Sequence, residues 1–365
     1  MEKKGTVYLG LSGGVDSAVA GARVLQQGYD VVPVFLKWWE NVDAAACPWK
    51  EDQEAALATA EALGISDAFR TWNFSEEFFQ DVFTPLIEDA KAGFTGNPDA
   101  DCNRVVKFGA FLNRALAEGA DFVATGHYSR VRRAGDQYEL LRPLCEAKND
   151  QTYFLWQLTQ EQLARVLFPI GEFPSKEAVR AEAQKRGLPS ADRKSTRGIC
   201  GIEKRNYASG YSDFLGEYIP GSEGDIVTTG NRVVGRHAGV ARYTLGQRKG
   251  IGVIADGGPY YVVEKDFHAN ILRVASSAEA QSLLFKEEAF IRDVKWISGN
   301  APAFPLQCSA FVRHPQIELV SCSVMREGET LRVRFDEPQW SPTPGQSIVL
   351  YDGDVVLGGG VIQER

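Results

Sequence analysis

Residues 6–17, TVYLGLSGGVDS, decide the fold of this 365-residue chain. The apolar run Thr6–Leu11 predicts a buried strand, and the spacing of Val19, Ala22 and Leu25 predicts a helix directly after it. A turn of Ser and Gly between strand and helix leaves backbone N–H groups at the positive end of the helix dipole. The stretch therefore predicts a site for phosphate or pyrophosphate. It is not a Walker A loop, because it lacks the lysine of G-x-x-x-x-G-K-[ST].

A purely structural explanation of this turn is open, because Ser, Gly and Asp also serve as caps and turn residues in any α/β protein. A serine at each end, an Asp at the fifth position and the strand upstream favour function. SGGVDS resembles the pyrophosphate loop of the ATP-pyrophosphatase superfamily. That resemblance implies adenylation of a substrate oxygen, after which ammonia, an amino acid or sulfur displaces AMP.

Strand and helix patterns alternate up to about residue 200, which predicts an α/β fold with a doubly wound parallel sheet. In such sheets the ligand lies at the carboxyl ends of the strands. SGGVDS and Thr125-Gly126-His127 both follow predicted strands and are expected at that edge. The other predicted elements are a strand at Asp30–Phe35, helices near Lys50–Leu63, Glu76–Lys91 and Asn103–Ala117, and a strand at Phe122–Thr125.

The pattern changes after about residue 205, where Gly-rich turns and short alternating strands begin. Strand patterns from Glu288 to the end resemble a small antiparallel barrel. We expect a catalytic domain at 1–205, a small central domain at 206–276 and a C-terminal β-barrel at 277–365.

Composition limits the function classes. A net charge of −8 argues against indiscriminate nucleic-acid binding but allows a local basic face. No apolar run approaches a membrane span, and the chain enters its first strand within a few residues, so we expect a cytoplasmic protein without a membrane contact. Six cysteines without a C-x-x-C pair and only four histidines give metal ligation poor support.

Two cysteines have environments that favour thiolate. Cys102 is expected at a helix start beside Arg104 and Lys107, and Cys200 lies between glycines in a basic segment. An incidental cysteine in a surface loop remains the alternative for Cys200. Two activated thiols beside an adenylating loop suggest sulfur as the nucleophile, with a persulfide on one cysteine and a resolving thiol on the other.

The ordered motifs SGGVDS, NPD-x-x-CNR-x-x-KFG, ATGHY, DQ-[ST]-YFL, GIC, YTLGQRKGIG and PGQ resemble the tRNA-specific 2-thiouridylases over nearly the whole chain. The resemblance implies a monomer that uses ATP, Mg²⁺ and a persulfide sulfur-donor protein to thiolate the wobble uridine (position 34) in the tRNA anticodon loop. It also implies that the central domain and the C-terminal barrel contact tRNA. It makes Cys200 the persulfide carrier, Cys102 the thiol that closes a transient disulfide with it, and Asp99 the acid/base group. The residues implied to bind ATP are Gly10, Leu11, Ser12, Gly13, Gly14, Val15, Asp16, Ser17, Leu36 and Gly126, with Mg²⁺ near Asp16. The target uridine base would contact Asn97, Pro98 and Asp99. Other parts of the tRNA would contact His127, Lys148, Asn149, Asp150, Gln151, Arg313, His314 and Gln346.

The chemistry is consistent with this implication. The C2 oxygen of a pyrimidine is a poor leaving group, and adenylation lets it depart as AMP. A wobble base already lies in a single-stranded loop, so its extrusion costs little. The chain departs from the family pattern at Asn149, at Gly201 after the GIC cysteine, and in a longer segment downstream of it.

Three other functions compete. A pyrophosphate-loop ligase using ammonia or an amino acid explains residues 1–35 but gives Cys102, Cys200 and the barrel no role. An RNA-binding protein that has lost activity is disfavoured by the intact motifs. A metal- or cluster-dependent tRNA thiolase needs clustered Cys or His ligands, which the sequence lacks.

Overall fold

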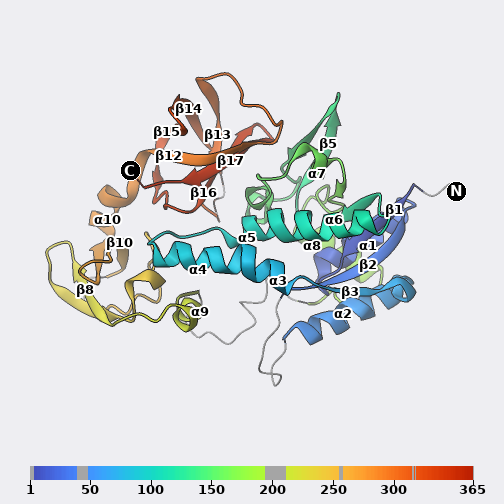
Figure 1. Ribbon diagram of the computed structural model, residues 1–365, viewed down its shortest axis with the longest axis horizontal. Helices are drawn as coiled ribbons and strands as arrows, with labels where there is room; N and C mark the ends of the chain where they lie inside the picture. Colours follow the sequence, from blue (N-terminus) through green and yellow to red (C-terminus); the bar gives the residue numbers. More distant parts are fainter. Residues whose placement is uncertain are drawn as a thin grey trace.

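The computed structural model describes residues 4–38, 48–193, 211–254, 258–314, 316 and 318–364, which form three regions (Figure 1). They are an α/β unit, a small mixed sheet and a closed barrel. No helix in these residues is long and apolar enough to cross a membrane.

A five-stranded parallel sheet in the order β3-β2-β1-β4-β7 forms the centre of the first region. Along β1, Val7 and Leu9 join one apolar cluster while Tyr8 joins another, because successive side chains point to opposite faces. The strand order reverses between β1 and β4, which opens a crevice at their carboxyl ends. The predicted doubly wound sheet is confirmed. Its strands are β1 (Thr6–Gly10), β2 (Asp30–Lys37), β3 (Arg70–Asn73), β4 (Phe122–Ala124) and β7 (Val166–Leu167).

Helices cover both faces of this sheet. Two of them contain π-helical segments, at Phe79–Phe83 and Cys102–Ala110, and are therefore continuous from Ser75 to Lys91 and from Pro98 to Ala117. The helices are α1 (Val15–Gln26), α2 (Pro48–Ala62), α3 (Ser75–Phe78), α4 (Thr84–Lys91), α5 (Pro98–Asp101), α6 (Phe111–Ala117), α7 (Gln160–Leu163) and α8 (Lys176–Lys185).

The small mixed sheet has the order β10-β11-β8-β9, with β11 parallel to β8 and the other pairs antiparallel. Its core includes Ile226, Val262 and Leu272. The elements are α9 (Tyr211–Tyr218), β8 (Gly224–Thr228), β9 (Val233–His237), β10 (Tyr260–Asp266), β11 (Ile271–Ser276) and α10 (Ser277–Leu284).

The C-terminal region is an antiparallel barrel in the order β12-β15-β14-β13-β16-β17, closed by pairing of β12 with β17. The predicted barrel is thus confirmed. A hairpin of the first region, β5 with β6, extends this sheet through the pair Leu141–Val355. The strands are β5 (Arg130–Ala134), β6 (Gln137–Leu141), β12 (Phe285–Trp296), β13 (Leu306–Phe311), β14 (Val320–Glu327), β15 (Thr330–Trp340), β16 (Ser347–Asp352) and β17 (Val355–Ile362).

One apolar cluster runs from the first region into the barrel. It includes Phe111 beneath the parallel sheet, Tyr153 and Trp156 in the connecting segment, and Phe311 and Tyr351 in barrel strands. All five side chains are buried. Because a close-packed interior has low compressibility, this shared cluster holds the barrel in place against the helix that carries Cys102.

Candidate active site

The loop Ser12–Ser17 lies at the carboxyl end of β1, where the crevice opens. Ser17 Oγ donates to the Gly14 carbonyl at 3.1 Å and accepts from the Ser12 amide at 3.2 Å, and the two serine hydroxyls are 3.1 Å apart. Gly14 caps α1 without a side chain, so no side chain occupies the N–H groups of the first turn. The loop is therefore shaped by its serines and presents amides suited to an anion.

Two glycines are required by close backbone contacts. Gly13 has φ +77°, and a Cβ there would lie 2.5 Å from the Asp52 carbonyl oxygen. A Cβ on Gly126 would lie 2.6 Å from both the Asp16 carbonyl carbon and the Ser17 nitrogen. The turn after β4 thus supports the first turn of α1 directly.

The Asp16 carboxylate is held by two residues to which the sequence assigned no role. Tyr128 donates its hydroxyl to Oδ1 at 2.7 Å, and Lys176 Nζ lies 3.3 Å from Oδ2. Burial, together with the Asp16 charge, raises the pKa of Tyr128, which keeps the phenol a donor. Tyr128 belongs to the quoted ATGHY motif, but Lys176 lies 160 residues from Asp16, and no local signal indicated it.

The adenine side of the predicted site lies on three adjacent strands. A Cβ on Gly10 would make ordinary 3.6 Å contacts with Leu36 on β2 and Thr125 after β4. Arg193 also contacts the loop, donating to the Gly13 carbonyl at 3.1 Å and pairing with Asp52 at 3.0 Å. Gly10 and Leu36 are therefore neighbours on adjacent strands, and Gly126 lies against the loop itself. Nucleotide binding by these residues stays a prediction.

The predicted base-binding residues begin the helix that carries Cys102. The sequence placed this helix start at Asn103, but the helix begins at Pro98, because Asn97 caps it and proline suits the first helical position. Cys102 is therefore one turn inside the helix, buried, at the start of the π-helical segment. Such segments frequently mark functional sites.

Asp99 lies in the first turn of this helix. Burial raises the pKa of its carboxyl, and the positive charge of Lys107 partly opposes that increase. Asn103 donates to the Phe154 carbonyl at 3.2 Å, while its Oδ1 atom is buried without a partner among the described residues. A carboxyl whose pKa is raised by burial is a candidate functional group. Cys200, the proposed persulfide carrier, lies outside the described residues.

Several predicted tRNA residues have internal partners. The His127 ring is buried between Phe108 and Phe168, and its Nδ1 lies 2.7 Å from Thr125 Oγ1. Burial lowers its pKa well below the usual value, so the ring is neutral. Its contact with tRNA stays a prediction.

The predicted segment 148–151 is mostly internal as well. Asp150 pairs with Arg142 at 2.7 Å and accepts from the amide and hydroxyl of Thr152. Gln151 accepts from the Tyr128 amide at 2.8 Å, and Asn149 is buried, whereas Lys148 is exposed.

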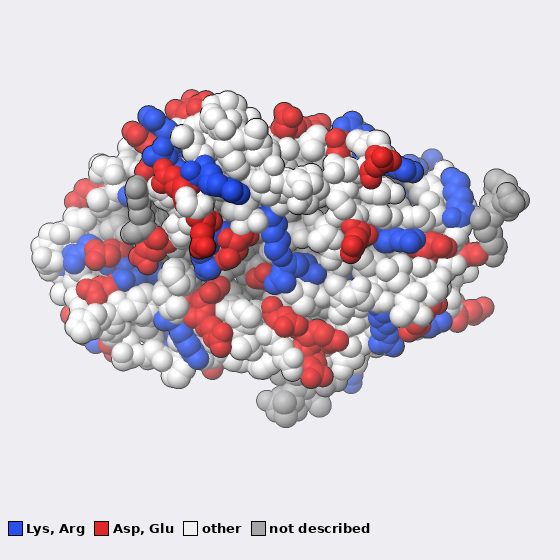
Figure 2. Space-filling view, turned by 45° about the horizontal axis from the view of Figure 1, so that its top comes forward, with Lys and Arg blue, Asp and Glu red and all other residues white. Residues whose placement is uncertain are grey.

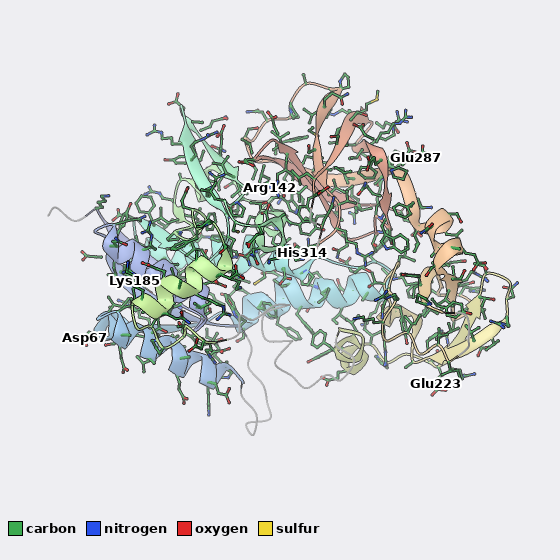
Figure 3. All side chains as sticks on the ribbon, turned by 180° about the vertical axis from the view of Figure 1, so that it is seen from behind. Asp67, Arg142, Lys185, Glu223, Glu287 and His314 are labelled. Atoms are coloured by element: carbon green, nitrogen blue, oxygen red, sulfur yellow. The ribbon has the colours of Figure 1, made fainter. Side chains whose placement is uncertain are left out.

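The barrel residues of the prediction lie at the junction with the first region. His314 contacts the rings of Phe154 and Phe311, and Figure 3 shows it between the barrel and the helices. Arg313 donates to the Leu245 carbonyl at 3.4 Å, and burial lowers its pKa. Gln346 contacts the chain just before Asn97.

Comparison with known proteins covers the whole chain. The family model described as tRNA methyl transferase HUP domain matches residues 5–204, the tRNA methyl transferase PRC-barrel domain matches 212–276, and the Aminomethyltransferase beta-barrel domain matches 286–362. A solved structure of NMN synthetase from Francisella tularensis aligns over 53% of this chain and 67% of its own, with 17% identity and a TM-score of 0.32, too low to support an argument.

Curated relatives are much closer. The tRNA-specific 2-thiouridylase MnmA of Ralstonia nicotianae is 43% identical, covering 98% of this chain and 95% of the relative. That of Listeria monocytogenes serotype 4a is 41% identical, with 98% and 94% coverage, and that of Alkaliphilus oremlandii is 42% identical, with 98% and 97% coverage. With identity at this level along the full length, the chain belongs to the tRNA-specific 2-thiouridylase (MnmA) family.

Proposed function

We propose that this chain is an ATP-dependent tRNA-uridine 2-sulfurtransferase that forms 2-thiouridine at the wobble position. The observation that carries the proposal is the placement of two chemistries in one region. An anion-binding loop lies at the switch point of the sheet, and the Asp99–Cys102 turn begins a helix packed beneath the same sheet. The full-length identity to 2-thiouridylases supports the same reaction.

The loop Ser12–Ser17 binds the phosphates of ATP through its amides, and Leu36 and Gly126 contact the nucleoside. The uridine O2 attacks the α-phosphate, and pyrophosphate leaves. Asp16, whose carboxylate contacts Tyr128 and Lys176, is the residue beside the loop that would hold Mg²⁺, and the ion would neutralise phosphate charge. A nucleotide-bound Mg²⁺ needs only one or two protein carboxylates, so the single Asp16 fits.

Sulfur transfer uses the two cysteines. Cys102 thiolate attacks the inner sulfur of a Cys200 persulfide, and the S–S bond breaks with its electrons on the terminal sulfur. That sulfur attacks C2 of the adenylated uridine, and AMP leaves with the former O2. Cys102 and Cys200 are left as a disulfide, which a thiol reductant must open before the next turnover. Asp99 is the acid/base group of the reaction: it takes a proton from the uridine base and returns it.

The remaining partners follow from this chemistry. A persulfide-carrying protein transfers its sulfur to Cys200. The enzyme is a cytoplasmic monomer. Acidic and basic side chains alternate over the face shown in Figure 2, so tRNA is bound through local basic contacts rather than a broad positive field.

The test supplies purified protein with ATP, unmodified tRNA and a persulfide donor, and digested tRNA is examined by mass spectrometry. We expect ATP-dependent 2-thiouridine at the wobble position and none with Cys102→Ala or Cys200→Ala. Full activity of both variants would overturn the proposed sulfur transfer. Product formed only with free ammonia would favour the ligase alternative.

A further inference from the structure

The segment 93–97, here called the 93–97 linker, joins α4 to α5 and ends directly before Pro98 and Asp99. Figure 1 shows this connection passing beneath the barrel and beside the small mixed sheet. It makes two backbone hydrogen bonds to the end of the preceding helix, from the Gly93 and Phe94 amides. The Thr95 amide and the carbonyls of Gly93, Thr95 and Gly96 are contacted by the other two regions of the protein.

The barrel provides most of these contacts through Gln346. Its Nε2 donates to the carbonyl oxygens of Thr95 at 2.9 Å and Gly96 at 2.7 Å, and its Oε1 accepts from the Tyr153 hydroxyl at 3.4 Å. The Thr95 amide donates to the Pro344 carbonyl at 2.9 Å. Both N–H groups of the Gln346 amide are therefore used inside the protein.

Ser347 holds the other end of the 93–97 linker. Its buried hydroxyl accepts from Asn97 Nδ2 and from Trp156 Nε1, both at 3.2 Å. Its carbonyl accepts from the Tyr153 hydroxyl at 3.0 Å. Because Asn97 also caps the helix through the Ala100 amide, Ser347 is linked to the helix start by one side chain.

The small mixed sheet contacts the opposite end. Lys265 Nζ donates to the Gly93 carbonyl at 2.5 Å, and Thr95 Oγ1 lies 3.4 Å from Thr244 Oγ1. A Cβ on Gly93 would lie 2.9 Å from the Phe267 ring, so the linker backbone packs closely on this sheet. Residues from two distant parts of the chain thus hold the five residues before Pro98.

We propose that Gln346, Ser347 and Lys265 are positioning residues, which hold the 93–97 linker so that Asp99 and Cys102 meet the target base in reactive geometry. The inference rests on the proposed function for its catalytic consequence, but the hold itself is independent of the reaction. It gives Gln346 a role beside the tRNA contact that the family resemblance implies, and that contact stays a prediction. A side chain whose amide is satisfied internally acts on the reaction through the linker.

Gln346→Ala tests the proposal, with Gln339→Ala as a matched control. Gln339 Nε2 also donates to two backbone carbonyls, those of Glu337 and Pro338, but both lie in its own strand β15. Hydrogen exchange of the peptide spanning the linker is measured by mass spectrometry. We expect faster exchange in Gln346→Ala and wild-type exchange in Gln339→Ala. Unchanged exchange in Gln346→Ala would show that Gln346 does not hold the 93–97 linker in place, independently of any activity measurement.

Kinetics then separate positioning from RNA contact. At saturating tRNA we expect Gln346→Ala to lower kcat for pyrophosphate release by roughly 10- to 100-fold, because small misplacements in an active site have effects of that size. The dissociation constant for unmodified tRNA should stay within about threefold. A tenfold weaker tRNA affinity with unchanged kcat would refute the positioning role.

Two further variants guard against misfolding of Gln346→Ala. Ser347→Ala removes the acceptor of Asn97, and Lys265→Met removes the donor to Gly93; both should accelerate linker exchange while the barrel strands keep wild-type protection. Normal linker exchange in both would refute the proposal. If the wild-type protein makes no 2-thiouridine, the proposed function fails. The exchange results would still show whether Gln346, Ser347 and Lys265 hold the 93–97 linker in place.

Discussion

Gly126→Ala tests how the nucleotide loop is supported. The added Cβ would lie 2.6 Å from backbone atoms of Asp16 and Ser17, whereas ordinary contacts begin near 3.4 Å. The first turn of α1 and the turn after β4 must therefore separate by roughly 0.8 Å, the difference between these distances. Both contacted groups are backbone, so no rotamer change relieves the overlap.

The expected effect follows from that displacement. Overpacking that moves backbone costs about 1–3 kcal/mol. If the strain falls on the loop that binds phosphate, ATP affinity drops about 5- to 150-fold. Isothermal titration with ATP measures this directly, and pyrophosphate release with tRNA measures its catalytic consequence.

Gly230→Ala is the matched control for Gly126→Ala. Its Cβ would meet only the Thr228 hydroxyl, at 3.9 Å, so ATP binding should match wild type. The tRNA affinity of Gly126→Ala should also stay near wild type, because the overlap lies at the loop. An ATP affinity within threefold of wild type in Gly126→Ala would show that the turn after β4 does not support the loop.

Three further predictions follow from the charges and thiols. Lys107→Gln removes the positive charge that partly opposes the raised pKa of Asp99, so the pKa of Asp99 should rise further. In a plot of the single-turnover rate against pH, the acidic limb should then move to higher pH. An acidic limb that stays in place or moves to lower pH would contradict this role of Lys107. His127 has a lowered pKa in the folded protein, so below about pH 6.5 the unfolded chain binds the proton more readily and the free energy of unfolding falls. Urea unfolding at pH 7.5 and pH 5.5 should therefore show a smaller loss of stability in His127→Gln than in the wild type. An equal loss in both proteins would show that the His127 pKa is not lowered. Cys308 and Cys322 face each other on paired strands with sulfurs 3.6 Å apart, so oxidised glutathione should join them, read by peptide mass; if both cysteines stay alkylatable after oxidation, the pair is not a disulfide site.

The sequence predicted the elements whose residues alternate or repeat with a clear period. The strands at Thr6 and Asp30 and the long helices appeared near their observed positions, because each buries an apolar face. The hairpin β5–β6 was missed, since most of its first strand is exposed and charged. The four-residue β3 buries only Trp72 and gives no alternation to detect.

The site was predictable where function lies in contiguous motifs. The Ser12–Ser17 loop carries its own turn chemistry and lies, as expected, between a strand and a helix, whereas the helix that carries Cys102 begins five residues before the predicted start at Asn103. The partners of Asp16 were not predictable, because Tyr128 and Lys176 are 112 and 160 residues away. Only the fold brings their side chains to that carboxylate.

Asp150 shows why a motif does not reveal the role of each residue in it. The family resemblance implied an RNA contact, yet its side chain is only 1% exposed and is bonded to Arg142 and Thr152. A buried carboxylate is tolerated only with such partners. The same backbone turn leaves its neighbour Lys148 exposed. Removing the Asp150 side chain would therefore leave Arg142 without its partner, so a loss of tRNA binding in such a variant would combine a disturbed turn with any lost RNA contact.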